Sequence, residues 1–419
     1  MLVLAASVLD PDTLAGQTPG AGEVERIREE LERLKEEFEA VQLQYEARLR
    51  ALEARLGDLQ AAPPPGAPGP DAQVPPPPAP PPVPAAPPPV PAAPVPASGS
   101  KIFNPDIAVI GDFLGAAGHN PVEDAPSLEL HEAEASFQAV VDPYARADFF
   151  FAFGPEGAEI EEGFVTFTAL PGALLLKAGK LRAALGKVNQ MHNHVLPWTD
   201  RPLVTTNLVG GEEGISNAGL SVSRLILNPL FFLEATGEVY RGNDLVFQSD
   251  ERDDLTWVGR LRGYRDFTES TNLDVGASIA YGPTDAGGDS DARLLGIDAT
   301  FRYRPLRRAL YRRFVARTEL IWSRQALESG RQRAFGFYAG SEYQFARRWV
   351  AGLRYDWSER ARAPSLEDWG GSMLLTFWPS EFSQIRGQYR YTRYGEGVAA
   401  NELLFQCLFA IGAHGAHVF

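Results

Sequence analysis

The sequence contains little of the chemistry that most enzymes and metal-dependent folds use. Cys407 is the single cysteine among 419 residues, so no intrachain disulfide forms and no cysteine pair can hold zinc. No run of about 18 apolar residues occurs, and no transmembrane helix is therefore predicted. The nucleophile-elbow, zinc-protease, phosphate-loop and dinucleotide motifs are also absent. We therefore predict neither an enzyme nor a bound cofactor.

Positive charge is also scarce relative to negative charge. The chain has 39 lysine and arginine residues against 54 aspartate and glutamate residues, a net charge of -15. Proteins that bind nucleic acid present clustered basic surfaces to the phosphates. No nucleic-acid partner is therefore predicted.

Proline is concentrated in one segment and is rare elsewhere. Between Ala61 and Ser98 lie 19 of the 34 prolines. Such a composition favours polyproline II at about 3.1 Å per residue, so this stretch would reach roughly 120 Å when fully extended. Residues 61–100 are predicted to be a Pro/Ala-rich linker.

The segment before the linker has a heptad pattern. From Val24 to Leu59, apolar residues are spaced three or four positions apart with charged residues between them. A helix with such a narrow apolar stripe needs a partner, so residues 23–60 are predicted to form a coiled coil. The alternative is a helix that packs on its own barrel. Residues 1–22 begin with a short apolar run and are predicted to be a truncated signal peptide or a disordered end.

Residues 101–419 have a different texture, with short runs of alternating apolar and polar residues that end at glycine, proline or acidic clusters. Each run is about as long as a tilted strand that spans a membrane. The fold class predicted is an all-β membrane protein, a closed antiparallel transmembrane β-barrel of about 16 strands. The predicted strands are 106–115, 128–141, 144–154, 160–170, 174–186, 218–226, 230–242, 255–267, 272–283, 293–305, 312–325, 333–345, 349–360, 369–380, 383–396 and 402–419.

The connections between these runs alternate in length. Odd connections are mostly long and polar, such as those at 116–127 and 361–368, whereas even connections are short. Bacterial outer-membrane barrels have long external loops and short periplasmic turns. An even number of strands then leaves both ends of the barrel, and the coiled coil, in the periplasm.

Three further patterns favour a membrane barrel. Leu295, Ile297 and Ala299 share one face of their strand and Asp298 shares the other with Thr300, although the pattern alone does not decide which face is outside. Six tryptophans fall near strand ends, as the aromatic girdles of membrane barrels require. The chain also stops at Phe419, in the manner of strands read by the outer-membrane assembly machinery.

Residues 174–203, LLLKAGKLRAALGKVNQMHNHVLPWTDRPL, resemble a strand and loop of the phosphate-selective (OprO/OprP-like) porin superfamily. This resemblance implies a sixteen-stranded trimeric porin, in some members with a periplasmic coiled coil. Ala184 and Leu185 stand where the family usually has a Pro-Phe pair, and no arginine ladder is evident. The resemblance therefore implies a porin but not phosphate selectivity.

The longest connection, 187–217, is the third external loop by parity. We expect it to fold into the barrel and narrow the pore, the alternative being a lid at the surface. His192 and His194 could bind a metal ion with Glu212 or Glu213 as a third ligand, the alternative being histidines hydrogen-bonded to the backbone. The charged or histidine residues of the constriction are predicted to be Lys187, His192, His194, Asp200, Arg201, Glu212 and Glu213.

Strand parity also predicts which charges face the lumen. The acidic residues concentrate early in the chain and the basic residues late, which would place them on opposite walls and create a transverse field. The alternative is solvated charges with no selective role. The predicted lumen residues are Lys180, Arg182, Arg260, Arg262, Arg302, Arg317, Arg354, Arg386, Arg390, Glu132, Glu134, Glu234 and Glu238.

The sequence therefore predicts a porin of the bacterial outer membrane for passive diffusion of small polar or ionic solutes. Its partners would be outer-membrane lipids and two further copies, forming a homotrimer through the barrel and the coiled coil. One alternative is a structural tether that engages peptidoglycan or a periplasmic protein. Another is a substrate or metal receptor like the TonB-dependent receptors, although the chain has no room for their plug.

Overall fold

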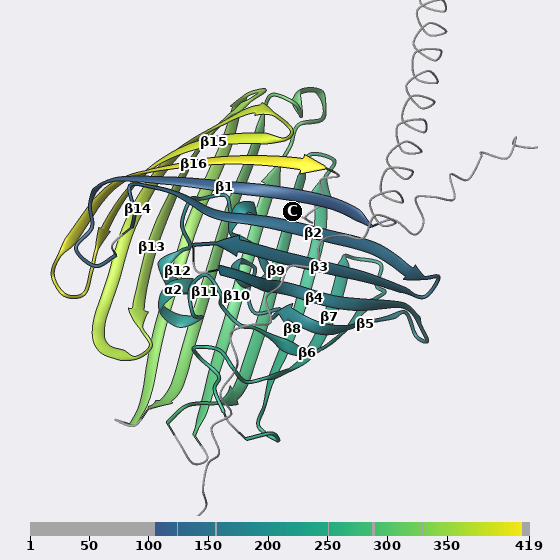
Figure 1. Cartoon of the computed structure of the whole chain (residues 1–419). Coiled ribbons are helices and arrows are strands. Elements are labelled where there is room, and N and C mark those ends of the chain that lie inside the picture. Colours follow the sequence, from purple (N-terminus) through teal and green to yellow (C-terminus); the bar gives the residue numbers. More distant parts are fainter. Residues whose placement is uncertain are drawn as a thin grey trace, which may run out of the picture. The chain divides into compact units, whose positions relative to one another are not determined.

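The described part of the chain is one closed barrel. The computed structural model describes residues 105–412, apart from residues 124, 156, 250, 287–289 and 328–329. Sixteen antiparallel strands each pair with their neighbours in sequence, and β1 pairs with β16 to close the barrel (Figure 1). The strands are β1 Asp106–His119, β2 Leu128–Asp142, β3 Ala145–Gly154, β4 Gly157–Leu170, β5 Leu174–Arg182, β6 Ser216–Ile226, β7 Phe232–Arg241, β8 Leu255–Thr268, β9 Thr271–Pro283, β10 Asp291–Tyr303, β11 Arg313–Leu327, β12 Gly330–Ala346, β13 Trp349–Arg360, β14 Ala363–Ser380, β15 Ser383–Arg393 and β16 Ala399–Gly412.

The described helices are short. Three lie in the connection between β5 and β6: the 3-10 helices η1 (Val188–Gln190) and η2 (Asn193–Val195) and the α-helix α2 (Leu203–Leu208). A further 3-10 helix, η3 (Leu306–Arg308), lies between β10 and β11. None of the described helices is long and apolar enough to cross a membrane.

All sixteen predicted strands overlap observed strands, but one predicted loop is wrong. Residues 361–368 were expected to form a long external loop, whereas β14 begins at Ala363 and pairs with β13 across an irregularity at Glu359 and Arg360. Arg360 Nε donates to Asp368 Oδ2 at 2.8 Å between the two strands. Polar residues can therefore continue the ladder because cross-strand ion pairs and backbone bonds satisfy them.

The structure decides which face of each strand is outside. Leu295 and Ile297 of β10 are 40% and 45% exposed. Asp298 and Thr300, which point to the other side of the same strand, are buried within the barrel. Trp257, Trp322 and many other large apolar side chains are likewise exposed on the outer surface. A barrel in water would present the opposite arrangement, so an apolar solvent is the environment that this surface fits.

Several predicted features lie outside the described residues. These are the N-terminal segment 1–22, the coiled coil 23–60, the linker 61–100 and the final residues up to Phe419. They remain predictions from the sequence.

Candidate functional site

The most elaborate part of the interior is the connection of residues 183–215 between β5 and β6, which we call the inward loop. It begins four residues earlier and ends two residues earlier than the predicted 187–217. Ala183, Leu185 and Ile215 are already fully buried, because the chain leaves the barrel wall directly after Arg182. The backbone N–H of Ala183 donates to the carbonyl of Ile215 at 2.9 Å, so the two ends of the loop are adjacent.

The first residues of the inward loop are anchored to strands β7 to β11. Ala184 N donates to Glu238 Oε2 of β7 at 2.7 Å, and Gly186 N donates to Ser278 Oγ of β9 at 3.0 Å. The carboxylate of Glu319 on β11 accepts from the next two backbone N–H groups at 3.3 and 3.2 Å. Gly186 has a φ of +60°, a left-handed conformation that favours glycine, and a Cβ there would displace the Glu319 carboxylate. The path of the loop across this wall is therefore tightly specified.

The later residues of the inward loop are anchored to β13 and β15. Asp200 Oδ2 forms ion pairs with Arg354 at 2.8 Å and Arg390 at 3.2 Å. Burial by itself raises the pKa of Asp200, but the two guanidinium groups outweigh it and lower the pKa to about 2. The helix α2 that follows packs against β11, β12 and β13. Asp200 therefore stays charged and holds this part of the loop against the wall.

The middle of the inward loop reaches the strands β2 and β4. His192 Nδ1 lies 2.8 Å from Glu134 Oε2 and 2.5 Å from Glu161 Oε2, and its Nε2 lies 2.9 Å from Glu162 Oε2. Burial lowers the pKa of His192, but the hydrogen bonds to these carboxylates outweigh burial and raise the pKa well above its usual range. The imidazole is therefore a cation that donates from both nitrogens.

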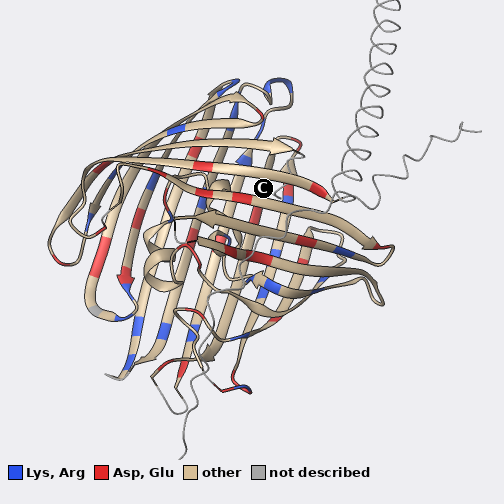
Figure 2. Ribbon diagram, viewed as in Figure 1, with Lys and Arg blue, Asp and Glu red and all other residues tan. Residues whose placement is uncertain are grey.

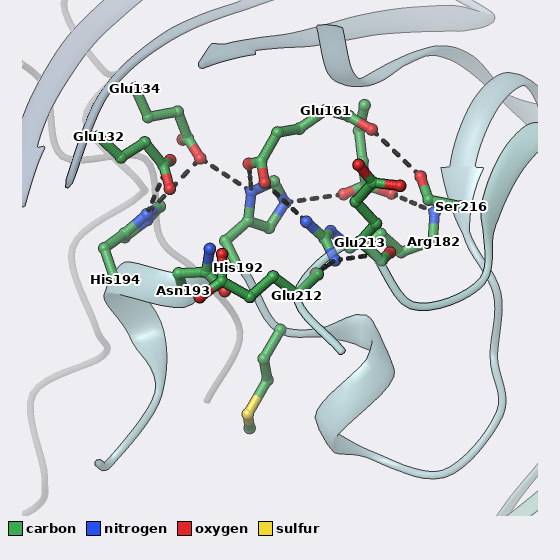
Figure 3. A network of polar contacts seen from close by, with 12 residues as sticks. Glu132, Glu134, Glu161, Arg182, His192, Asn193, His194, Glu212, Glu213 and Ser216 are labelled. Atoms are coloured by element: carbon green, nitrogen blue, oxygen red, sulfur yellow. Dashed lines mark hydrogen bonds and ion pairs between the residues drawn. The ribbon is translucent and has the colours of Figure 1, made fainter. Parts of the chain in front are cut away.

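His194 lies beside His192 in the same cluster. Its Nδ1 is 3.6 Å from Glu134 Oε2 and 4.0 Å from Glu132 Oε1 (Figure 3). The two imidazole rings are 5.8 Å apart. Both histidines thus lie beside carboxylates of β2, and His192 also lies beside those of β4.

Arg201 and Asn189 hold the inward loop to itself. Arg201 is buried and donates to the carbonyls of Val188 at 3.2 Å and Met191 at 2.8 Å. The side chain of Asn189 bonds both ends of the loop, donating to Ala183 O and accepting from Ile215 N. Arg201 was predicted as a constriction charge, but its guanidinium is used within the loop, where it satisfies carbonyls that no strand reaches.

Taken together, these contacts carry the inward loop across the barrel interior. It bonds to β2 and β4 and also to strands from β7 to β15, and in Figure 1 α2 lies within the outline of the barrel. A loop folded into the barrel was predicted from its length. The alternative of a surface lid does not fit these contacts.

Glu212 and Glu213 do not join the histidines, so the predicted third metal ligand is wrong. Both side chains are exposed, and the Glu212 carboxylate lies 3.6 Å from His131. Their backbone carbonyls accept from Arg182 Nη1 at 3.0 and 3.3 Å. The carboxylates that meet the histidines come from β2 and β4, which are near in space but distant in sequence.

Lys180 was predicted to face the lumen and instead lies on the outer face. It pairs with Gly163 of β4 and Ala218 of β6, next to the exposed Leu220. Its Nζ donates to the carbonyl of Ile160 at 2.6 Å. Lys180 has the same parity as Arg182, but the strand ends at Arg182, whose side chain turns inward to Glu161 at 2.6 Å. Parity therefore failed at the strand end.

The other predicted lumen residues lie on the inner face, where many are ion-paired. Arg260 bonds Asp298 at 2.8 Å, and Arg262 bonds Asp274 at 2.9 Å. Ion pairs of this kind recur along these strands. Because the paired charges largely cancel, the predicted transverse field is reduced. Inner-face members of the predicted set are Arg182, Arg260, Arg262, Arg302, Arg317, Arg354, Arg386, Arg390, Glu132, Glu134, Glu234 and Glu238. Figure 2 shows acidic segments on β1 to β4, the wall that carries Asp112, Glu132 and Glu134.

Glu161 and Glu162 are site residues that sequence reasoning missed. The pairing of β3 with β4 shifts between Phe150 and Phe151, which leaves Glu161 without a direct partner. This bulge turns two adjacent side chains to the same side, where strict alternation allows only one. The signal in the sequence is the pair of adjacent glutamates inside an alternating run.

Two cavities lie on either side of the middle of the inward loop. One, of about 460 Å³, is bordered by Asn193, His131 and Arg182 and by six acidic residues of β2, β4 and the loop end: Glu129, Glu132, Glu159, Glu161, Glu212 and Glu213. We call it the acidic cavity. The other, of about 300 Å³, is bordered by Met191 and His194 to Pro197, by the acidic residues Glu342 and Glu381, and by five basic residues: Lys187, Arg302, Arg313, Arg317 and Arg386. We call it the basic cavity. The loop thus separates a mainly acidic cavity from a mainly basic one.

Comparison by sequence gives a similar protein and no family. No family model matches the chain. A protein of Aquifex aeolicus (strain VF5), described as uncharacterized, is 27% identical over 385 residues, covering 76% of this chain and 81% of that protein.

Among solved structures, an anion-selective porin from Comamonas acidovorans has a TM-score of 0.53 at 9% identity, covering 73% of this chain and 99% of the porin. The outer membrane channel DcaP of Acinetobacter baumannii has a TM-score of 0.50 at 11% identity, covering 74% of this chain and 96% of DcaP. Salmonella typhi OmpF has a TM-score of 0.50 at 9% identity, covering 74% of this chain and 99% of OmpF. At such identities the likeness concerns architecture, and the chain has the barrel fold seen in bacterial porins.

Proposed function

We propose that this protein is a porin of the bacterial outer membrane through which small polar or ionic solutes diffuse passively. The observation that carries the proposal is the combination of an apolar outer surface with a charged interior in one closed barrel. Such a barrel satisfies its backbone groups internally and exposes apolar side chains to lipid, as a membrane requires. The porin architecture of the similar structures supports the same conclusion.

The inward loop is the proposed constriction. It divides the acidic cavity from the basic cavity, so a solute that crosses the barrel meets both signs of charge. Opposed charges in a narrow pore orient dipolar solutes and set ion preference. The basic residues that line the basic cavity, such as Lys187 and Arg386, are the proposed determinants of selectivity.

The assembly and the family are proposals from the sequence. We propose a homotrimer joined by barrel contacts and by the coiled coil of residues 23–60, which would lie in the periplasm at the end of the 61–100 linker. Membership of the phosphate-selective porin superfamily is proposed from residues 174–203. A tether to peptidoglycan or to a periplasmic protein has no observation in the barrel that favours it.

Bilayer recording tests the proposed channel directly. We expect purified full-length protein to produce discrete conductance steps in planar lipid bilayers, because a hydrated interior crosses the membrane. The control is the same preparation unfolded by boiling in dodecyl sulfate, which contains the same detergent and contaminants. If the folded protein gives no steps above this control, the porin proposal is wrong.

The charge of Lys187 is expected to make ion preference depend on pH. Burial lowers the pKa of Lys187 to about 8, with Arg302 adding to the decrease. A group of that pKa is about nine-tenths protonated at pH 7 and about one-tenth at pH 9. The charged groups that face it are Asp274 of β9, Asp298 and Arg302 of β10, and Arg317 and Glu319 of β11. Because the basic cavity loses a cation on deprotonation, preference should shift toward cations as pH rises.

Reversal potentials in a salt gradient measure this shift between pH 7 and pH 9. In a Lys187→Arg variant the shift should disappear, since guanidinium stays protonated at both values. In a Lys187→Met variant the reversal potential at both pH values should equal that of the wild type at pH 9. Equal pH shifts in all three proteins would assign the effect to another group.

A further inference from the structure

The contact between the inward loop and strands β2 and β4 concentrates negative charge in a buried place. Glu134 is 1% exposed, and Glu132, Glu161 and His194 are each less than 9% exposed. Arg182 pairs with Glu161 at 2.6 Å, and His192 contacts Glu134, Glu161 and Glu162. Arg182 is thus the one arginine among four glutamates, Glu132, Glu134, Glu161 and Glu162. Buried carboxylates are costly unless a cation or a proton balances each of them.

The spacing around His194 differs from the spacing around His192. His192 lies at hydrogen-bonding distances of 2.5–2.9 Å from its carboxylates. His194 Nδ1 lies 3.6 Å from Glu134 Oε2 and 4.0 Å from Glu132 Oε1. One ligand atom from each of the three residues lies within 4.8 Å of the other two. Two ligand atoms bound tetrahedrally at about 2.0–2.1 Å from zinc are separated by roughly 3.3 Å. The His194 group therefore has nearly the spacing of metal ligands, whereas the His192 group has that of hydrogen bonds.

Two carboxylate oxygens in this group have no hydrogen-bond donor. Oε1 of Glu132 and Oε1 of Glu134 are both buried and make no hydrogen bond in the described structure. Buried polar atoms are nearly always satisfied, and an exception indicates strain, a functional role, or a water molecule or ion at that position. Figure 3 shows both side chains directed toward the histidines. The unsatisfied oxygens are therefore an observation, independent of the spacing, that points to a cation.

The acidic cavity supplies a path for a cation to this group. Glu132 and Glu161 border the cavity, and Glu129, Glu159, Glu212 and Glu213 line the rest of its acidic surface. Arg182 also lines the cavity but is paired with Glu161, so the lining is mainly acidic. A cleft lined mainly by one sign of charge raises the local concentration of counter-ions. Glu212 and Glu213, which were predicted as ligands, belong to this entrance instead.

We propose that His194, Glu132 and Glu134 bind one divalent transition-metal ion of the zinc class. Imidazole nitrogen together with carboxylate oxygen suits zinc and its neighbours, whereas magnesium and calcium prefer oxygen ligands alone. His192 positions Glu134 and Glu161 through its hydrogen bonds and is not itself a ligand. Water in the acidic cavity completes the coordination. The ion lies between the inward loop and β2 and joins them.

Zinc binding to the folded full-length protein tests the proposal. The protein is purified in detergent with a tag that contains no histidine, stripped with a chelator, dialysed against Zn²⁺ and analysed for bound metal. We expect one Zn²⁺ per chain, retained in excess Mg²⁺ and Ca²⁺. His194→Ala and Glu132→Gln should each weaken binding at least about tenfold, since even loss of a residue behind a ligand costs about 10–100-fold. Glu132→Gln keeps the shape of the side chain and guards against misfolding.

His119→Ala is the matched control, because His119 is exposed at the end of β1 and distant from the cluster in the barrel wall. It should bind zinc as the wild type does, and the folded mobility of every variant on a gel shows that the barrel is intact. Binding by His194→Ala and Glu132→Gln equal to that of the wild type would overturn the proposal, as would the absence of stoichiometric zinc. The assay needs no conductance, so its failure is separable from failure of the channel proposal.

Discussion

Replacing Arg354 with alanine should destabilise the folded barrel by about 3–5 kcal/mol, the usual cost of removing one partner of a buried ion pair. The Arg354 side chain is 1% exposed, with Nη2 2.8 Å from Asp200 Oδ2 and Nε 2.7 Å from Asp356 Oδ2. Its guanidinium also lies over the Trp198 ring, 4.9 Å from the centroid. Alanine would remove this cation from the carboxylates of Asp200 in the inward loop and Asp356 in β13.

Arg331→Ala provides the matched comparison for this variant. Arg331 pairs with Asp291 at 2.6 Å, but its side chain is 49% exposed. Exposed pairs contribute about 0–1 kcal/mol, so this variant should remain close to the wild type. Urea unfolding in detergent, followed by tryptophan fluorescence and by folded mobility on gels, measures both. If both variants lost the same free energy of unfolding, burial of the Arg354 ion pairs would not determine how much they stabilise the barrel.

Removing the inward loop should increase single-channel conductance severalfold. Residues 187–213 would be excised and Gly186 joined to Gly214 by a short Gly-Ser turn. Closure is feasible because Ala183 N and Ile215 O are 2.9 Å apart, so the ends of the loop already meet. Water would replace the loop and hydrate the carboxylates that it covers. The current then depends on the full width of the barrel rather than on the two cavities beside the loop.

The control for loop removal is a deletion of similar kind in an exposed connection. Residues 306–311, between β10 and β11, include Leu306 and Leu310, which are 63% and 64% exposed. Replacing them with two glycines should leave conductance near that of the wild type. An unchanged conductance in the variant that lacks the inward loop would mean that the loop does not limit flow.

The barrel was predictable because its signal is local. Alternation with a period of two in each strand follows directly from strand geometry, as in β10, where Leu295 and Ile297 face out and Asp298 faces in. The signal failed where regular geometry stops. Lys180 has the parity of Arg182, but Arg182 ends the strand and its side chain turns inward, so the two side chains lie on different faces. At residues 361–368 polar composition was interpreted as a loop, although cross-strand bonds continue the sheet.

The candidate site was predictable only in part. The length of the connection indicated that it folds inward, and the sequence drew attention to His192 and His194 within it. Their acidic partners could not be identified from the sequence. Glu134 of β2 and Glu161 of β4 reach the loop only after the barrel closes, and the side chain of Glu161 is turned inward by a bulge. Glu212 and Glu213 are nearer to the histidines in sequence but line the acidic cavity.

By itself the sequence determined the number of strands, their approximate bounds and the two chemically distinct faces, because alternation is a property of each strand alone. Only the tertiary structure decided that the apolar face is outside and that Arg201 is used within the loop. It also decided that His194 meets Glu132 and Glu134. Those arrangements depend on which distant segments share the interior after the barrel closes, and no local pattern encodes such a pairing.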